Sequence, residues 1–199
     1  SVTPDDFDTI YITHPHPDHV GGVTQWLNRT FALGVAQTDL SDEQILTPIP
    51  MTYPGASPEA AGAPRILAPG VATLGAIPFV DIFPLSLFRP QMIEQVLAVN
   101  VADVGVILIT GCGHPGLARM VRIAETTLGQ PVVGVVGGLH YGETVTDDVQ
   151  DGIALLRARN ARLVSLSPHD TGPTGLAAFA AAFPQAYYTI AVGETIVVR

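Results

Sequence analysis

The sequence contains no lysine, and all nine of its basic residues are arginine. This absence excludes chemistry that depends on a lysine amine, such as Schiff-base formation or the anchoring of pyridoxal phosphate. Charged residues make up only 14% of the chain, and the formal net charge is −9. Because an acidic chain repels polyanions, and no basic stripe with interleaved aromatics is present, we expect no nucleic-acid partner.

Cysteine is also scarce. Cys112 is the single cysteine of the sequence, so no disulfide can form within the chain. Cysteine usage therefore does not indicate whether the protein works in an oxidising or a reducing compartment. Hydrophobic runs such as Val104–Ile109 are far shorter than the roughly 20 residues that span a bilayer, so we expect no membrane partner. No signal peptide is visible in this chain, which favours a cytoplasmic location without establishing it.

Strand and helix patterns alternate along most of the chain. The predicted strands cover Thr9–Thr13, Gln95–Val101, Val104–Thr110, Pro131–Gly137 and Arg162–Ser167, with two closing strands near Gly193. The predicted helices cover Val20–Asn28, Pro115–Leu128, Asp147–Arg159 and Thr174–Phe183. This alternation predicts one α/β layered domain over residues 1–199. Residues 31–90 are proline-rich and irregular, and we expect them to form a wall that selects the substrate.

The sharpest motif is HPHPDH at residues 14–19, directly after the first predicted strand. A residue that precedes proline is biased toward extended backbone, so the side chains of His14 and His16 should point to the same side. Asp18 and His19 follow where the chain turns into a helix. Imidazole and carboxylate ligands suit zinc, manganese or iron better than calcium or copper(I), so the motif predicts a metal site.

The other three histidines also follow predicted strands. His114 comes after the strand ending at Thr110, and His140 and His169 come after the next two predicted strands. Chance would scatter some of the six histidines over helices or surface loops. Since α/β folds place ligand-binding groups at the carboxyl ends of strands, we expect all six imidazoles to gather at one site.

Two further side chains close to these histidines keep more than one interpretation. Cys112 is either a zinc ligand near His114 or a buried thiol that packs as a small apolar residue. Asp170 is favoured as a turn-forming residue, with a metal ligand, a partner of His169 and a proton shuttle as alternatives.

Taken together, the motifs resemble the metallo-β-lactamase superfamily. The pattern H-x-H-x-D-H after a strand is similar to the metal motif of that superfamily. ITGCGHPG, VVGGLH and PHDTG resemble the TGCxHxG, GGxHL and HCTG patterns of a branch described as dihydropterin–ribofuranosylaminobenzene phosphate synthase-like, or as metal-dependent hydrolases. The resemblance runs from Asp5 to Val198 and implies a four-layer αβ/βα sandwich. Asp170 and Tyr141 stand where cysteine and leucine are usual in the branch.

Members of the superfamily carry several strands before this motif, and only about a dozen residues precede it here. We therefore expect some N-terminal strands of the family fold to be absent from this chain or supplied by another arrangement. The resemblance also implies two divalent metal ions, for which we expect zinc, with iron or manganese as alternatives. The implied ligands are His14, His16 and His114 for the first ion and Asp18, His19 and His169 for the second, with Cys112 and His140 as further candidates. Asp18 and His140 are the implied catalytic residues, the first orienting the nucleophile and the second donating a hydrogen bond to substrate.

The implied activity is metal-dependent hydrolysis of a small-molecule ester, lactone, amide or phosphodiester by a metal-bridged hydroxide. One alternative is an iron-dependent redox enzyme of the same fold, which would be coloured and dependent on a reductant. Another is a non-catalytic metal-binding sensor, which would hold metal without turnover. Homo-oligomerisation is left open by the sequence.

Overall fold

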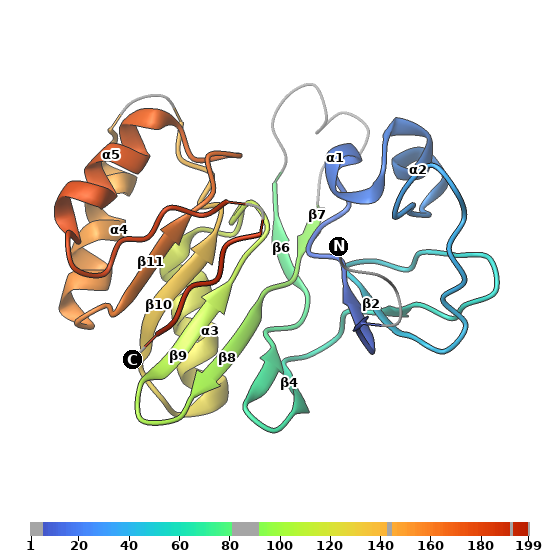
Figure 1. The fold of residues 1–199 in the computed structure, drawn as a ribbon, viewed down its shortest axis with the longest axis horizontal. Helices are drawn as coiled ribbons and strands as arrows, with labels where there is room; N and C mark the ends of the chain where they lie inside the picture. The colour runs from blue at the N-terminus through green and yellow to red at the C-terminus, as the bar shows by residue number, and fades with distance from the viewer. Residues whose placement is uncertain (1–5, 81–91, 143–144, 192, 199) are drawn as a thin grey trace. The chain divides into compact units, whose positions relative to one another are not determined.

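A computed structural model describes residues 6–80, 92–142, 145–191 and 193–198 of the chain (Figure 1). The chain divides into two compact units. Unit 1 comprises residues 1–63 and 75–95, and unit 2 comprises residues 64–74 and 96–199. Within the described residues, no helix has the length and apolar character needed to cross a membrane.

Unit 1 is built on a three-stranded parallel sheet and a separate antiparallel strand pair. The sheet has the order β1 (Thr9–Tyr11), β2 (Gln44–Thr47) and β3 (Glu59–Ala60), and the pair consists of β6 (Ile77–Phe79) and β7 (Met92–Glu94). Its hydrophobic core contains Ile12, Val20, Trp26, Phe31, Leu40, Ile45, Met51 and Tyr53. Burial of this core fixes β1, which leads directly into the HPHPDH motif.

The helix predicted over Val20–Asn28 is two short helices, α1 (Pro17–Val20) and α2 (Val23–Asn28). The break falls at two glycines. Gly21 has a φ of +94° and is so close to Ala32 that a Cβ there would lie 2.9 Å from the Ala32 carbonyl oxygen. The chain therefore turns sharply after α1, as the paired glycines allow.

Residues 31–90 contain more regular structure than the sequence predicted. Strands β2 to β6 fall in this segment, including β4 (Arg65–Ala68) and β5 (Val71–Thr73), and each is two to four residues long. Their partners come from distant parts of the chain, for example β1 for β2, so the local pattern could not reveal them. Residues 81–90 lie outside the described residues, and the role as a substrate wall stays a prediction.

Unit 2 contains a six-stranded sheet with the order β11-β10-β9-β8-β5-β4. The parallel part consists of β9 (Gly105–Ile109), β10 (Val132–Gly137) and β11 (Leu163–Leu166). Strand β8 (Leu97–Val101) joins β9 to the antiparallel strands β5 and β4. Helices follow each parallel strand, which confirms the predicted alternation and places the carboxyl ends of β9, β10 and β11 along one edge.

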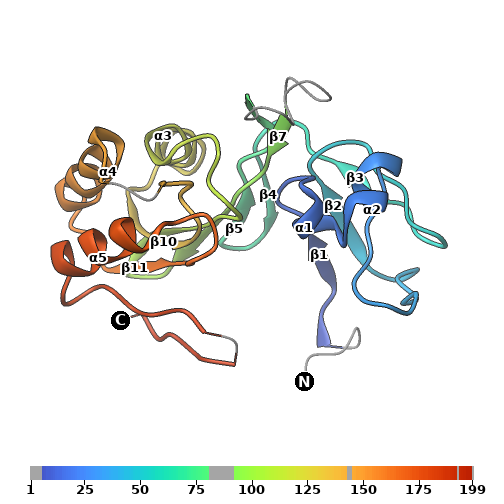
Figure 2. The ribbon, with the colours of Figure 1, turned by 90° about the horizontal axis from the view of Figure 1, so that it is seen from above.

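Helices α3 (Leu117–Leu128) and α4 (Asp147–Ala158) bury residues with helical periodicity, and α5 (Pro173–Ala182) follows β11. The buried positions are Leu117, Met120, Val121 and Ala124 in α3, and Val149, Gly152, Ile153 and Leu156 in α4. These two helices lie on one face of the sheet, and the C-terminal segment lies on the other (Figure 2). There, Ile196 and Val198 pack against a cluster formed by Ile107, Val133 and Leu163.

The two closing strands predicted near Gly193 are absent from the described residues. The C-terminal segment makes an isolated bridge between Tyr187 and Val164 and otherwise runs without a named strand. Its apolar side chains pack on the sheet face without a hydrogen-bonded ladder, so the prediction of strands was wrong although the hydrophobic pattern was real.

Candidate metal centre

The six histidines follow the carboxyl ends of strands, as predicted. His14, His16 and His19 come after β1, His114 after β9, His140 after β10 and His169 after β11. The first three of these histidines belong to unit 1, and the other three belong to unit 2.

In unit 1, the imidazoles of the HPHPDH motif lie against one another. The ring centroids of His14 and His16 are 4.8 Å apart, and those of His14 and His19 are 4.1 Å apart. His16 has extended backbone, with φ −67° and ψ 152°, as expected before proline. Asp18 lies beside His19, with 3.4 Å between its Oδ2 and the Nε2 of His19. The contact between His14 and His16 agrees with the expectation that these two side chains point to the same side, and their role as metal ligands stays a prediction.

The chain just before the motif is held by a residue that the sequence analysis missed. Gln95 is buried, and its Nε2 donates hydrogen bonds to the carbonyl oxygens of Ile12 (2.8 Å) and Leu46 (3.2 Å). Its backbone N–H donates to the carbonyl oxygen of Thr13 at 2.8 Å. The Thr13 hydroxyl lies 3.1 Å from Nδ1 of His14, within hydrogen-bond distance. A lone glutamine at the start of a predicted strand carries no local signal of this role.

Phe79 supplies an apolar wall to the same cluster. Its ring centroid lies 6.5 Å from that of His14 and 6.0 Å from that of His16, both edge-on. Phe79 is buried and belongs to β6, inside the segment at residues 31–90. An apolar neighbour lowers the local dielectric around the imidazoles and strengthens their interaction with a cation.

In unit 2, the site is assembled from the three loops that follow β9, β10 and β11. The loop after β9 is tied to the next by the Gly138 N–H, which donates to Gly111 O at 2.8 Å, and by the Thr110 hydroxyl, which donates to Gly138 O at 2.8 Å. The loops after β10 and β11 are tied by the Gly172 N–H, which donates to Tyr141 O at 2.9 Å. Neighbouring loops are thus tied together by hydrogen bonds to backbone groups.

Glycine is needed where the first two of these loops meet. Gly113 has a φ of +78°, and a Cβ there would lie 2.5 Å from the carbonyl oxygen of Gly138. Gly137 has a φ of +118°, and a Cβ would collide with the carbonyl oxygen of Thr110. The sequence motifs that contain these glycines therefore act by letting two backbones approach, which brings His114 next to His140.

His114, His140 and Asp170 form a candidate metal-ligand set within unit 2. Each offers one ligand atom, and these atoms all lie within 4.8 Å of one another. The ring centroids of the two histidines are 4.2 Å apart, and Nδ1 of His140 is 3.5 Å from Oδ2 of Asp170. His140 and Asp170 have left-handed backbone, with φ of +52° and +57°. Such strain costs about 1 kcal/mol per residue and is often found at functional sites.

The electrostatics of Asp170 follow from its neighbours. Burial alone would raise the pKa of its carboxyl group. The hydrogen bond from Cys112 and the nearby imidazoles of His140, His169 and His114 outweigh burial, so the pKa lies below its ordinary value of 3.8. The carboxylate form is therefore stabilised, and that form is the one that binds a cation.

These contacts describe the surroundings of the residues that the sequence left open. Asp170 has left-handed backbone, and its carboxyl group contacts Cys112 and His140, so its role as a turn residue, a ligand or a partner stays a prediction. Cys112 is buried in unit 2, which fits both of its interpretations. His169 is exposed, and its backbone N–H donates to the Ser167 hydroxyl at 3.2 Å. The assignment of His14, His16 and His114 to one ion and of Asp18, His19 and His169 to another stays a prediction.

Tyr141, next to His140, was noted only as a departure from the family pattern. Its ring stacks on Phe179, with centroids 5.8 Å apart and 19° between planes. Burial raises the pKa of Tyr141 to about 12, with further contributions from the negative charges of Asp148 and Asp151. The phenol is therefore protonated at neutral pH, and two carboxylates of α4 make the electrostatic potential around it more negative.

Comparison with known proteins agrees with this architecture. The family model described as metallo-beta-lactamase superfamily matches residues 1–45, which include the HPHPDH motif. A curated relative from Methanocaldococcus jannaschii is named 7,8-dihydropterin-6-methyl-4-(beta-D-ribofuranosyl)-aminobenzene-5'-phosphate synthase. It is 22% identical over 228 aligned residues, which cover 98% of this chain and 77% of the relative.

The fold is similar to that of a solved structure, Tm1679, described as a metal-dependent hydrolase of the beta-lactamase superfamily. The TM-score is 0.58 at 20% sequence identity, and the match covers 72% of this chain and 60% of the other. The family model, the curated relative and the fold all support the resemblance of this chain to the metallo-β-lactamase superfamily. The predicted α/β fold of this type is confirmed.

Proposed function

We propose that this chain is a metal-dependent hydrolase that acts on a small-molecule ester, lactone, amide or phosphodiester. The observation that carries the proposal is the convergence of imidazoles within each unit, at centroid distances of 4.1 to 4.8 Å. The resemblance to the metallo-β-lactamase superfamily also supports metal-dependent chemistry.

The donor set fits divalent metal ions of the zinc type. Within unit 2, two imidazoles and a carboxylate offer atoms within 4.8 Å of one another, and within unit 1 three imidazoles are adjacent. Nitrogen and carboxylate ligands suit zinc, with iron and manganese as alternatives, and we propose two ions for each chain. A bound divalent cation would acidify a coordinated water and polarise the electrophilic group of the substrate.

The residues of the chain would supply orientation and proton handling. Asp170 accepts from Cys112 and lies beside Nδ1 of His140, so it orients that imidazole and keeps its own charge. Asp18 is exposed on α1 and would orient the attacking water as a hydrogen-bond acceptor. His140 would donate a hydrogen bond to the substrate or act as a further ligand.

Metal analysis of the purified chain tests the proposal. We expect about two divalent ions for each wild-type chain and a clear loss of metal in His16→Ala, His114→Ala and His169→Ala. Gln150→Ala, on the exposed face of α4, is the control and should keep full metal content. If the histidine variants keep the wild-type content while folded by circular dichroism, the ligand assignment is wrong.

A panel containing an ester, a lactone, an amide and a phosphodiester then tests turnover. Metal-stripped protein should be inactive and should regain activity when zinc is returned. Bound iron with colour and reductant dependence would instead favour redox chemistry, and metal without turnover of any substrate would favour a sensor. Because the Methanocaldococcus jannaschii relative is named a synthase, bond formation should be assayed in the reverse direction as well.

A further inference from the structure

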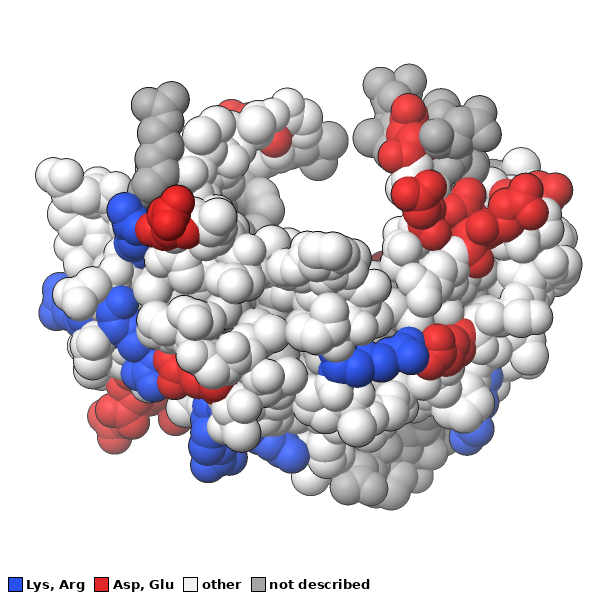
Figure 3. Space-filling model, turned by 90° about the horizontal axis from the view of Figure 1, so that it is seen from below, with Lys and Arg blue, Asp and Glu red and all other residues white. Residues whose placement is uncertain are grey.

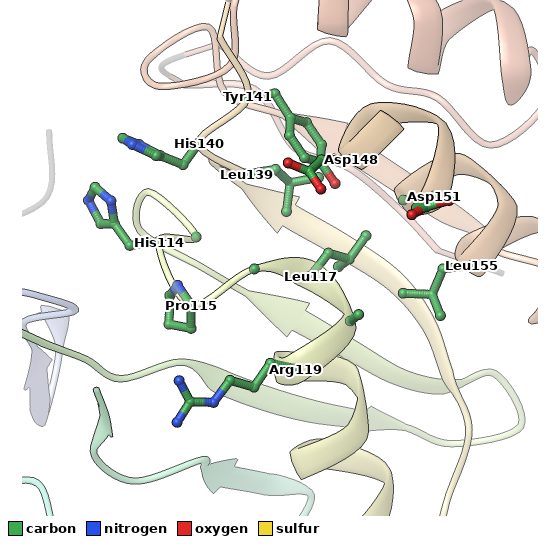
Figure 4. Close-up of a pocket in the computed structure, with 14 residues that line it drawn as sticks. His114, Pro115, Leu117, Arg119, Leu139, His140, Tyr141, Asp148, Asp151 and Leu155 are labelled. Atoms are coloured by element: carbon green, nitrogen blue, oxygen red, sulfur yellow. The ribbon is translucent and has the colours of Figure 1, made fainter. Parts of the chain in front are cut away.

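Unit 2 contains a cavity of about 660 Å³ between helices α3 and α4, which we call the α3–α4 cavity (Figure 4). His114 and His140 line one end of it. Leu117, Leu139 and Leu155 supply apolar walls. Small-molecule sites occupy roughly 300 to 1,000 Å³ and combine apolar walls with a few polar groups, so this cavity has the size and lining of a ligand site.

The charged groups of the cavity are unevenly placed. Asp148 and Asp151 line it from α4, and Arg119 lines it from α3. Figure 4 shows the two imidazoles on one side, Asp151 on the opposite side and Asp148 beside Tyr141. Both carboxylates act on the Tyr141 hydroxyl. The end of the cavity away from the imidazoles is therefore negative, and an anionic group would be repelled there.

The wall formed by Tyr141 is held in place by its surroundings. Its hydroxyl lies against Gly152 of α4, where any Cβ would collide with the phenol oxygen, and its ring stacks on Phe179. Tyr141 also bridges to Thr171 in the loop after β11. A glycine in mid-helix costs stability, and here it provides the room for the tyrosine that shapes the cavity.

We infer that the α3–α4 cavity binds the non-reacting part of the substrate, a ring or branched apolar group that is uncharged or positively charged at its far end. The inference rests on the proposed function for one point only, namely that the reacting group lies at the imidazole end. The occupancy of the cavity by such a group follows from its own lining and charge. Leu155 and Ala118, on opposite walls, then limit the size of the group.

Binding of two matched probes to the full chain tests this without any turnover. The probes are 2-naphthyltrimethylammonium and 2-naphthalenesulfonate, which share the ring and differ in charge, titrated by calorimetry. We expect the cation to bind at least about tenfold more tightly than the sulfonate. In the double variant Asp148→Asn/Asp151→Asn, the preference for the cation over the sulfonate should shrink to about threefold or less, because the two carboxylates are expected to cause it.

Filling the cavity should weaken binding of both probes. Leu155→Trp and, from the other wall, Ala118→Trp should each raise the dissociation constant at least about tenfold. Leu33→Trp, an exposed leucine of unit 1, is the matched control and should leave it within about twofold. Two filling positions are used so that a folding defect in one leaves the other to decide.

The inference is overturned if neither probe binds saturably, if the two bind equally, or if both filling variants bind like the control. Hydrolysis of 2-naphthyl acetate by the zinc-loaded chain is measured in parallel. Absence of hydrolysis together with charge-selective binding would count against the proposed function and in favour of the cavity. Hydrolysis without probe binding would support the proposed function and count against the inference about the cavity.

Discussion

The two units build their histidine clusters in different ways. In unit 1, three imidazoles and a carboxylate come from the six consecutive residues 14–19. In unit 2, the candidate ligand set of His114, His140 and Asp170 comes from three loops that are far apart in sequence and tied together by backbone hydrogen bonds. A contiguous motif depends on local backbone preferences, whereas an assembled set depends on the packing of its loops. The unit 2 cluster should therefore be more sensitive to substitutions outside the ligands.

The largest effect on stability is expected at the contact between two loops of unit 2. Gly113→Ala combines a left-handed backbone with a Cβ 2.5 Å from Gly138 O, so it should lower the free energy of unfolding by about 3 kcal/mol. Gly129→Ala, with a φ of +63° and open space around it, should lose only about 1 kcal/mol. Urea denaturation measures both. Equal losses of stability in the two variants would show that the loops can move apart to accept the Cβ. The cluster of unit 2 would then not be more sensitive than that of unit 1 to substitutions outside the ligands.

The corresponding support in unit 1 is the side chain of Gln95. Gln95→Leu removes both hydrogen bonds to the carbonyl groups of Ile12 and Leu46 inside the core, which should cost about 2 kcal/mol. Gln44→Leu, on the exposed side of β2, is the matched control and should change stability by less than about 0.5 kcal/mol. A Gln95 variant as stable as the control would mean that the motif needs no remote support at all.

A smaller effect is expected when Asp170 loses its charge but keeps its shape. Asp170→Asn should lower zinc affinity about tenfold, because a charged group beside His140 becomes neutral. Asp103→Asn is a close control, since Asp103 also has left-handed backbone, with a φ of +61°, and asparagine tolerates that conformation. Competition with a coloured chelator measures the affinity. Unchanged zinc binding in Asp170→Asn would remove this carboxylate from the ligand set.

The smallest effect concerns an ion pair away from the site. Glu125 in α3 accepts two hydrogen bonds from Arg159, at 2.7 and 2.9 Å, and a third from the Val132 N–H at 3.2 Å. The bonds from Arg159 lower the pKa of Glu125, so their contribution is complete above its ordinary value of 4.5 and is lost as the pH falls through the lowered value. Glu125→Gln should cost about 1 kcal/mol at pH 7, and the difference should vanish in acid. Thermal unfolding of both proteins at several pH values measures the difference in stability. A difference that stays the same in acid would contradict the prediction.

The difference between the units also explains what the sequence could reveal. The HPHPDH motif is local, and proline restricts the backbone on both sides of His16, so the convergence of its imidazoles was predictable. The strands β9, β10 and β11 have strong hydrophobic patterns, and the position of a histidine after each followed from the alternation of strands and helices.

The remaining features depend on contacts between distant residues. Gln95 donates a hydrogen bond to Ile12, which lies 83 residues earlier in the sequence. Phe79 contacts His16 from the segment 31–90, which the sequence pattern predicted to be irregular. The contact of Asp170 with His140 requires the hydrogen bonds between their loops. The short strands of residues 31–90 pair with distant partners in the same manner. Local pattern carries no information on such pairings, which only the folded chain reveals.

The surface agrees with the acidic composition on the face shown in Figure 3, where arginine side chains lie in small separate groups among acidic and uncharged residues. The expectation of no nucleic-acid partner stays a prediction, and a binding assay with duplex DNA at low salt would test it.

The burial of Cys112 has a practical consequence. The sequence has a single sulfhydryl, and that group is enclosed beside Asp170 within the loops of unit 2. A thiol reagent can reach it only when the residues around it separate, so the rate of its modification reports local opening without background from other thiols. The rate of Cys112 modification therefore measures how often the region around the thiol opens. Comparing this rate with and without a divalent cation would measure how far the cation slows that opening.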